Sequence, residues 1–251
     1  MPQNHQPFNK YNELGAYHYN ATIGAASPRL FNPRLFARYD TGVKVLEPKR
    51  GDVVVDAGSG EGVASFLTCQ LGGKVIAIEL EPEACRLGEK LRNERGISPE
   101  NLRFTRQNLY ALELPDASVN GIVSLEVIEH MSDVGQYLKE LERILVPGGR
   151  IVLTTPLKQP SGLQDPYHIR EFAPHELTEV VNTVFVNVKT YSAWAGWKNA
   201  WYESNGALLP LSKMKRGIVK LFAYLGWNFF TGPAIFDPRC PLLLTVAEKR
   251  K

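Results

Sequence analysis

Short apolar runs separated by helical patterns are the feature that most constrains the fold of this chain. The runs occupy residues 53–55, 75–78, 102–104, 122–125 and 151–153. Between them, residues 82–95 begin with a proline and have few apolar side chains, and residues 134–145 repeat leucine at helical spacing before the sequence VPGG. Runs of this kind form a buried parallel sheet whose two faces are covered by helices. The sequence therefore predicts a doubly wound α/β fold.

The two ends of the chain differ from this alternating middle. Residues 1–45 are rich in aromatic residues and loop formers, and we expect them to form a cap or a helical lead-in. Residues 184–188 and 242–246 have strand patterns, with an aromatic, irregular insertion at about 192–240 between the last two strands. A chain of 251 residues with 44% hydrophobic content can bury one full core. We therefore expect a single domain over residues 1–251.

The composition limits the expected cellular location of the protein and its expected binding partners. The sequence has neither the pattern of a signal peptide nor an apolar run of about 18 residues, so we expect a soluble, cytoplasmic protein. Cys69, Cys85 and Cys240 have no CxxC spacing, which argues against a disulfide framework and a cysteine-based zinc site. The net charge of +3 is too small to indicate a nucleic-acid partner.

The sequence VVVDAGSGEG, at residues 53–62, places a glycine-rich turn directly after a buried strand. Dinucleotide-binding turns have the spacing G-x-G-x-x-G, which fails here from either Gly58 or Gly60. The turn carries Asp56, whose carboxylate repels a phosphate and favours a positively charged ligand. Glu79 closes the next strand, where a carboxylate accepts hydrogen bonds from ribose hydroxyls. S-adenosylmethionine, which has a ribose and a positive centre but no pyrophosphate, meets both demands.

From about residue 45 to residue 177, the sequence resembles the class I S-adenosylmethionine-dependent methyltransferases. VVVDAGSGEG is similar to the first motif of the family, IAIEL with Glu79 to its ribose-binding acid, and LERILVPGGRIVLTTP to its later helix, turn and strand. RQNLYALELPDASVNGIVSLEVIEHM is similar to the adenine-binding stretch and the motif after the fourth strand, with Asn108 where the family more often has aspartate. An amide oxygen accepts the same hydrogen bond.

The resemblance implies a Rossmann-like, seven-stranded sheet whose last strand is antiparallel, with residues 242–246 as that strand. It also implies that the chain is a methyltransferase with S-adenosylmethionine as its cofactor. The cofactor-binding residues that follow from the matched motifs are Asp56, Gly58, Ser59, Gly60, Gly62, Glu79, Leu80, Asn108, Leu109 and Glu126.

Two histidines are the candidate catalytic residues. His130 follows the fourth apolar run and His168 follows the fifth, at the sheet edge where open α/β sheets hold their ligands. Methyl transfer to an alcohol or a phenol needs a group that removes the hydroxyl proton, and a histidine or a metal ion meets that need. His5, His18 and His175 carry no such pattern, and we predict no role for them.

Glu126, Glu129, His130 and His168 also resemble the metal-binding set of small-RNA 3′-terminal 2′-O-methyltransferases. LFNPRLFARY is loosely similar to the FxPP segment of those enzymes, with Arg34 in place of the second proline. Two carboxylates and two imidazoles suit Mg²⁺, Mn²⁺ or Zn²⁺. A helical turn starting at Leu125 would set Glu126 and His130 on one side, with Glu129 about 100° away. The same sequence patterns occur in enzymes resembling quinone and glycan methyltransferases, for which a metal is not generally assumed.

The insertion contains all four tryptophans, and Lys213, Lys215, Arg216 and Lys220 precede the apolar stretch LFAYLGWNFF. Three interpretations stay open: a hydrophobic lid on the sheet, a pocket for a bulky glycosyl or lipid-linked acceptor, and an interfacial helix in peripheral contact with a membrane of anionic lipid. We favour O-methylation of a small-molecule, glycan-linked or lipid-linked acceptor. The alternatives are a metal-dependent RNA 3′-terminal ribose 2′-O-methyltransferase and a non-catalytic cofactor-binding subunit.

Overall fold

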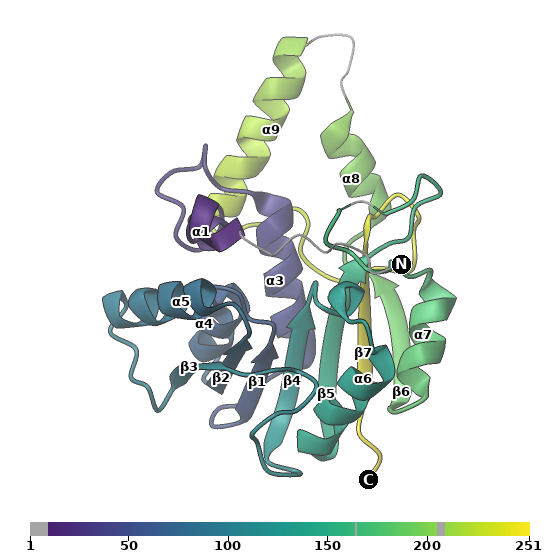
Figure 1. Ribbon diagram of the computed structural model, residues 1–251. Coiled ribbons are helices and arrows are strands. Elements are labelled where there is room, and N and C mark those ends of the chain that lie inside the picture. Colours follow the sequence, from purple (N-terminus) through teal and green to yellow (C-terminus); the bar gives the residue numbers. More distant parts are fainter. Residues whose placement is uncertain (1–9, 164, 205–208) are drawn as a thin grey trace.

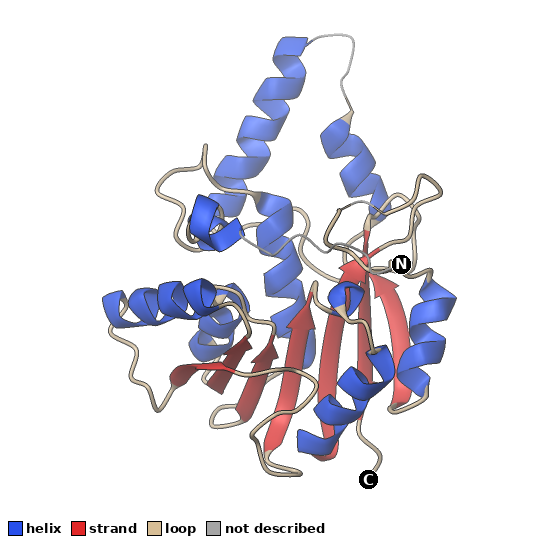
Figure 2. Cartoon of the chain, viewed as in Figure 1, coloured by secondary structure: helices blue, strands red, loops and turns tan. Residues whose placement is uncertain are grey.

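A seven-stranded mixed sheet forms the centre of the computed structural model, which describes residues 10–163, 165–204 and 209–251 (Figures 1 and 2). The strand order is β3-β2-β1-β4-β5-β7-β6. The strands are β1 (Val53–Ala57), β2 (Lys74–Glu79), β3 (Leu102–Arg106), β4 (Val119–Leu125), β5 (Leu145–Pro156), β6 (Val186–Ser192) and β7 (Leu242–Glu248). β7 lies between β5 and β6 and is antiparallel to both, whereas the pairs among β1 to β5 are parallel. The predicted α/β fold with an antiparallel last strand is confirmed.

Helices cover both faces of the sheet (Figure 2). On one face lie α3, α4 and α5, and on the other lie α6 and α7. The helices are α1 (Lys10–Leu14), α2 (Tyr17–Asn20), α3 (Pro33–Leu46), α4 (Val63–Gln70), α5 (Pro82–Glu94), α6 (Val134–Ile144), α7 (Pro174–Asn182), α8 (Gly196–Glu203) and α9 (Leu209–Tyr224). Alternate residues of each strand therefore enter different apolar cores.

Strand β1 illustrates how the sequence produces these two cores. Val55 packs with the α6 and α7 side of the sheet, whereas Val54 packs with α3 and α4. Asp56 has the parity of Val54, so its carboxyl group is carried into the α4 side of the sheet rather than into solvent. Burying an acid at the end of a central strand costs free energy unless the acid has partners. The burial of Asp56 therefore indicates a functional site at the carboxyl end of β1.

The ends of the chain are more regular than the sequence indicated. The predicted cap contains α1, α2 and most of α3, which begins at Pro33 behind an Asn32 cap whose Oδ1 accepts from Leu35 N at 3.1 Å. The prediction of an irregular insertion was wrong in its local structure, since two helices, α8 and α9, form within it. Residues 1–9, with His5, and residues 205–208 of the predicted cap and insertion lie outside the described residues.

Strand β6 was expected at residues 184–188 but is observed at Val186–Ser192. It is the edge strand of the sheet, and its alternation of partly buried and exposed residues gives a weaker apolar signal than that of a central strand. Among the described residues, we find no helix of the length and apolarity needed to cross a bilayer.

Candidate functional site

The glycine-rich turn between β1 and α4 has a backbone that side chains would not tolerate. Gly58 and Gly60 have φ values of 75° and 54°, in the left-handed region that favours glycine. A Cβ atom at Gly58 would collide with Val127, and one at Gly60 would collide with the hydroxyl of Tyr11. The turn therefore leaves its backbone closely approachable, as ligand binding at a helix N-terminus requires.

Asp56 lies buried at the start of this turn, with 2% of its surface exposed. Ser65 Oγ, in the first turn of α4, donates to Asp56 Oδ2 at 2.6 Å. Burial raises the pKa of the carboxyl group to about 7, although the hydrogen bonds from Ser65 act in the opposite direction. The carboxyl group is therefore poised to ionise when a positive charge approaches.

Glu79, at the end of β2, joins the next strand to the same turn. Its Oε2 accepts from Gly60 N at 2.9 Å, and its Oε1 accepts from Leu80 N at 2.7 Å and from Glu81 N at 3.0 Å. An ionised carboxylate has about four acceptor positions. Glu79 therefore holds the glycine-rich turn against β2 and keeps acceptor capacity for hydroxyl groups of a ligand.

Asn108 and Leu109 follow β3 and form the third wall of this half of the site. Asn108 Oδ1 accepts from Tyr110 N at 3.0 Å, which fixes the turn after the strand, and Leu109 is buried. The amide oxygen has a second lone pair for a donor on a ligand. The hydroxyl of Tyr110 accepts from Ser132 N at 2.8 Å and so ties this wall to the loop after β4.

These elements line one cleft of about 1000 Å³ at the carboxyl ends of the parallel strands. All the predicted cofactor-binding residues except Gly62 line it, and so do Glu129, His130 and His168. Gly62 instead begins α4 with φ 92°, packed so closely on Phe104 that a Cβ atom would collide with the ring. Gly62 therefore shapes the turn without lining the cleft.

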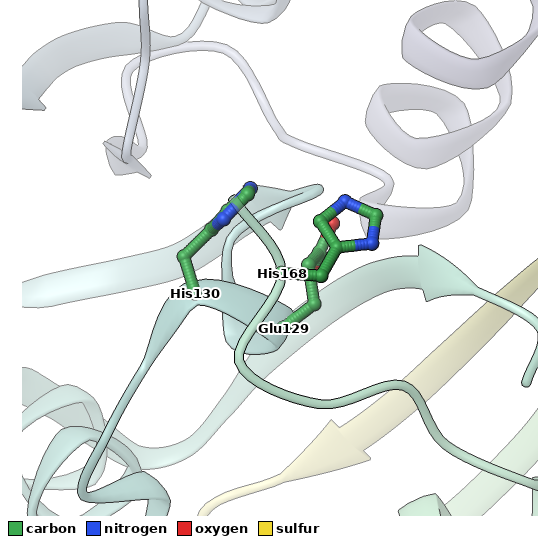
Figure 3. A group of neighbouring side chains, drawn as sticks. All are labelled: Glu129, His130 and His168. Atoms are coloured by element: carbon green, nitrogen blue, oxygen red, sulfur yellow. The ribbon is translucent and has the colours of Figure 1, made fainter. Parts of the chain in front are cut away.

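The other half of the cleft holds a compact group of Glu129, His130 and His168 (Figure 3). One ligand atom of each residue lies within 4.8 Å of those of the other two. The two imidazole rings meet edge to face, with centroids 5.1 Å apart. Glu129 and His130 come from a 3-10 turn at Ile128–His130, and His168 comes from the loop after β5.

Hydrogen bonds fix the orientation of both histidine rings. His130 Nδ1 donates to the carbonyl oxygen of Tyr167 at 2.9 Å, and His168 Nδ1 donates to Glu171 Oε1 at 2.8 Å. Because both partners are acceptors, each neutral ring carries its proton on Nδ1 and its lone pair on Nε2. Burial lowers the pKa of His130 below its ordinary value. Both Nε2 atoms are therefore suited to accept a proton or to bind a metal.

Glu129 is fully buried, with Oε2 accepting from Thr155 Oγ1 at 3.0 Å. Its Oε1 is buried and has no hydrogen-bond partner among the residues that the structure describes. Burial, together with the nearby charge of Glu126, raises the pKa of Glu129 well above its ordinary value. Its backbone carbonyl accepts from Ile169 N at 2.9 Å, which holds the His168 loop beside the turn.

Glu126 does not belong to this compact group. Glu126 follows β4 with a φ of 62°, so the helical turn expected from Leu125 does not form, and a 3-10 turn starts at Ile128 instead. Glu126 Oε2 pairs with Arg38 Nη1 at 3.0 Å, and its Oε1 accepts from Thr154 Oγ1 at 3.1 Å. The spacing argument assumed a regular helical turn from Leu125, whereas Glu129 and His130 lie in a 3-10 turn.

Several cleft residues come from the N-terminal helices, which we expected to form a cap or a helical lead-in without site residues. His18, for which we predicted no role, lines the cleft, and its Nδ1 lies 3.0 Å from the hydroxyl of Tyr39. Burial and the charge of Arg38 lower the pKa of His18 to about 3, so the ring is neutral at physiological pH. The aromatic run YNELGAYHY was the signal that this segment packs over a site.

Glu61, inside the glycine-rich turn, attaches this N-terminal cover. It is buried, and its Oε1 accepts from His18 N at 2.7 Å and from Tyr19 N at 3.0 Å. At the opposite side of the cleft, Lys10 Nζ pairs with Asp165 Oδ2 at 3.0 Å. The N-terminal helices therefore bridge the cofactor turn and the His168 loop.

Comparison with known proteins agrees with this architecture. Residues 55–153 match the family model described as "Methyltransferase domain". A probable S-adenosylmethionine-dependent methyltransferase of Mycolicibacterium smegmatis is 34% identical over 145 residues, which cover 55% of this chain and 53% of that protein. A probable tocopherol O-methyltransferase of Oryza sativa is 33% identical over 108 residues, which cover 43% of this chain and 30% of that protein.

Among solved structures, the YcgJ protein of Bacillus subtilis has the same fold, with a TM-score of 0.57 and 19% identity over 85% of this chain and 98% of that chain. The strand order and the sequence match together define a class: the sheet has the fold of the class I methyltransferases, and residues 55–153 match a methyltransferase domain. The matched segment spans about half the length of the mycobacterial relative.

Proposed function

We propose that the chain transfers a methyl group from S-adenosylmethionine to a hydroxyl group of a small-molecule, glycan-linked or lipid-linked acceptor. The observation that carries this proposal is a single cleft that has Asp56 and Glu79 at one side and His130 and His168 at the other. The match of residues 55–153 to a methyltransferase domain supports S-adenosylmethionine as the cofactor. The two histidines support a hydroxyl group as the methyl acceptor, because they can remove its proton.

The cofactor half of the cleft fits S-adenosylmethionine. When bound, the cofactor supplies an electrophilic methyl group on a positively charged sulfur. Glu79 and Asn108 offer acceptors for its ribose and adenine groups, and Asp56 offers a buried carboxyl group that ionises near neutral pH. A carboxylate in a buried site interacts strongly with a positive ligand because the local dielectric is low. The residues present therefore fit the group.

The acceptor half of the cleft supplies a base. His168 Nδ1 is held by Glu171, which is itself buried, so Nε2 is the atom that takes a proton from an acceptor hydroxyl. Glu171 stabilises the positive charge that His168 gains in that step. His130 Nε2 is held in the same way through the Tyr167 carbonyl and is the second candidate. The similarity to a probable tocopherol O-methyltransferase supports oxygen as the methylated atom.

A metal-assisted variant of this chemistry is a second candidate, and a specific observation favours it. Glu129 Oε1 is buried and accepts no hydrogen bond from the described part of the chain, and it lies next to two imidazoles whose Nδ1 atoms are bonded to other acceptors. Metal-binding histidines commonly have their second nitrogen bonded to a carboxylate or carbonyl oxygen, as both do here. A divalent ion held by Glu129, His130 and His168 would acidify a hydroxyl group. Glu126, paired with Arg38, is left out of this set.

In the metal-assisted variant, the acceptor is the 2′-hydroxyl group of an RNA 3′-terminal ribose. The remaining alternative is a non-catalytic subunit that binds the cofactor. The oriented imidazoles argue against the subunit, because a protein without catalysis needs neither base. The three candidates differ in measurable ways. The activity of a metal-free O-methyltransferase is unchanged by chelators, the RNA enzyme methylates an RNA 3′ end, and the subunit binds the cofactor without turnover.

The test begins with calorimetry of S-adenosylmethionine binding to the full chain and to Gly60→Val, which places a side chain against Tyr11. We expect micromolar-range binding by the wild type and none by the variant. Transfer of labelled methyl groups is then measured to a catechol, a prenol-linked phenol, a glycolipid and a short RNA. Failure of the wild type to bind the cofactor overturns the proposal, and methylation of the RNA alone replaces it with the second candidate.

A further inference from the structure

Helix α9 exposes a continuous apolar stripe. Met214, Ile218, Leu221 and Leu225 are all exposed, Leu225 to 70%, and their spacing of four, three and four residues places them on one side of the helix. The helical hydrogen bonding continues to Leu225, whose N donates to Leu221 O at 3.0 Å. The stripe is therefore a property of one ordered helix.

The opposite side of α9 is the one that packs on the protein. Ser212, Val219 and Ala223 are buried there, and Val219 belongs to the apolar core that contains Ala37 of α3. At about 100° per residue, these three lie roughly 140–180° around the helix from Met214. The apolar stripe consequently faces away from the body, on a helix that stands beyond the carboxyl edge of the sheet (Figure 1).

Aromatic side chains extend the stripe on the side of the helix that carries Lys215, because Phe222 lies about 80° from Met214 in the same direction. Trp227 is 63% exposed, and its ring lies 5.9 Å from that of the exposed Phe222. On the neighbouring helix α8, the exposed Trp201 lies under Lys215, whose Nζ is 4.7 Å from the ring centroid. The stripe, Phe222, Trp227 and Trp201 are called the α9 surface below. Exposed apolar groups gathered in this way mark an interaction surface.

The charge around the α9 surface has one sign. From residue 204 to residue 236 the sequence contains no aspartate or glutamate, whereas it contains Lys213, Lys215, Arg216 and Lys220. The nearest acid in sequence on α8, Glu203, is paired with Arg34 at 2.6 Å and with Arg216 at 3.5 Å. By helical position, Lys213 and Lys220 flank one side of the stripe and Lys215 flanks the other. The ammonium group of Lys215 donates to Trp201 O and to Ser204 O and Oγ, so it is held against the end of α8.

We propose that the α9 surface is a docking site for an anionic lipid bilayer. An apolar helix face with exposed tryptophans along one side and the exposed Lys213 along the other has the chemistry of the membrane interface, where aromatic rings sit at headgroup level and lysines reach anionic phosphates. A second copy of the chain fits less well, because a two-fold contact through this surface brings Lys213, Lys215 and Lys220 of one copy against those of the other.

The α9 surface is also connected to the cleft. Arg34 and Arg38 lie one turn apart on α3: Arg34 Nη1 donates to Asn199 Oδ1 of α8 at 3.0 Å, and Arg38 lines the cleft. Lys220 Nζ of α9 donates to Arg29 O at 3.0 Å, just before α3. The membrane inference rests on the proposed function in one respect. If the acceptor is lipid-linked, it would enter the cleft from the bilayer that the α9 surface binds.

The test is co-sedimentation of the full chain with vesicles of phosphatidylcholine alone and of phosphatidylcholine with phosphatidylglycerol. We expect binding to the anionic vesicles that weakens at high salt, and a loss of about tenfold or more in both Ile218→Glu and Lys213→Glu. Leu71→Glu, an equally exposed leucine at the end of α4 and outside the α9 surface, should bind as the wild type does. Circular dichroism of each variant checks folding, and two separate variants keep the test valid if one misfolds.

Three outcomes overturn the inference: equal binding to both kinds of vesicle, no binding to either, and binding to soluble polyglutamate that competes fully with the vesicles. A dimer that Ile218→Glu dissociates, without vesicle binding, assigns the α9 surface to a second copy instead. Calorimetry with S-adenosylmethionine is run in parallel on the same variants and should be unchanged. If the wild type does not bind S-adenosylmethionine, the proposed function is refuted, whereas the conclusion from vesicle binding is unaffected.

Discussion

Arg38 and Glu126, 88 positions apart in the chain, form an ion pair in the cleft, with Arg38 Nη1 3.0 Å from Glu126 Oε2. The pair joins α3 to the end of β4 and separates Glu126 from the group of Glu129, His130 and His168. This ion pair therefore anchors the N-terminal cover. It also engages Glu126, the first carboxylate of the EVIEH run, and leaves Glu129 beside the two histidines.

Replacing Arg38 with methionine leaves the Glu126 carboxylate without its charged partner. We expect the free energy of unfolding to fall by about 1–3 kcal/mol, the range for a charge-assisted hydrogen bond in a partly buried position. Arg38→Met combined with Glu126→Gln should lose less than the sum of the single changes. Lys90→Met removes the exposed pair with Glu94 and should cost under about 1 kcal/mol. Urea denaturation measures all four, and strict additivity would contradict the pairing.

Glu79 should contribute to cofactor binding. Glu79→Ala removes the acceptors that we assign to the ribose, and we expect calorimetry to show a loss of about 1–3 kcal/mol in the binding free energy of S-adenosylmethionine. Glu89→Ala, on the exposed side of α5, is the matched control and should bind as the wild type does. Unchanged binding by Glu79→Ala would refute the ribose assignment.

The base assignment predicts a change in turnover without a change in cofactor affinity. We expect His168→Ala or His130→Ala to lower kcat by about 10²–10⁴-fold, because a general base contributes an acceleration of that size. His175→Ala, an exposed histidine on α7, controls for the loss of an imidazole. Full activity in both cleft variants would remove the histidines from the mechanism.

The pKa of Asp56 predicts a pH-dependent cofactor affinity. The pKa is about 7 in the folded chain, against 3.8 for the ordinary group. A bound positive charge favours the ionised carboxylate, so binding should release a proton, and affinity should rise with pH up to about 7, by at most about tenfold per unit. Calorimetry in two buffers of different ionisation enthalpy measures the proton release. Asp56→Asn should bind with no such release.

The same shift has a consequence for the stability of the free protein. Because the folded pKa of Asp56 is raised, the folded state binds the proton more tightly than the unfolded state between about pH 4 and pH 7. The contribution of this group to the free energy of unfolding is therefore fully present below about pH 4 and is lost as the pH rises through about 7. Asp56→Asn should flatten that part of the pH profile.

The fold could be predicted from the sequence because its central strands are apolar on both faces, which leaves a buried parallel sheet as the solution. The cofactor turn could be predicted for a local reason: Gly58 and Gly60 need positive φ values, Glu79 ends β2, and Asp56 is the second-to-last residue of β1. Features of this kind are written in consecutive residues and do not depend on distant contacts.

The N-terminal side of the cleft could not be predicted in the same way. His18 and Arg38 acquire their roles from Glu61, Tyr39 and Glu126, through contacts that span 43, 21 and 88 positions. No periodicity encodes such pairings. The helical turn on which the metal-ligand spacing argument relied does not form for a related reason, since the backbone of Glu126 has a positive φ.

A metal ion in the cleft would separate the candidate reactions. Because one ligand atom each from Glu129, His130 and His168 lies within 4.8 Å of the others, small side-chain movements bring all three to about 2.0–2.3 Å from a shared ion. Two imidazoles with one carboxylate favour Zn²⁺ or Mn²⁺ over Mg²⁺. Elemental analysis of the purified chain should then find an ion that Glu129→Gln loses and Glu126→Gln keeps, since Glu126 is occupied by Arg38.

Glu171→Gln provides the finer measurement, because Glu171 contacts His168 Nδ1 and is outside the group of three. If His168 is a metal ligand, weakening this outer hydrogen bond should lower metal affinity about 10–100-fold in a competition with a chelating dye. If the ion is absent and chelators leave methyl transfer unchanged, the imidazoles act as ordinary bases and the RNA candidate loses its one supporting observation. Retention of the ion by Glu129→Gln would show that it binds elsewhere in the chain.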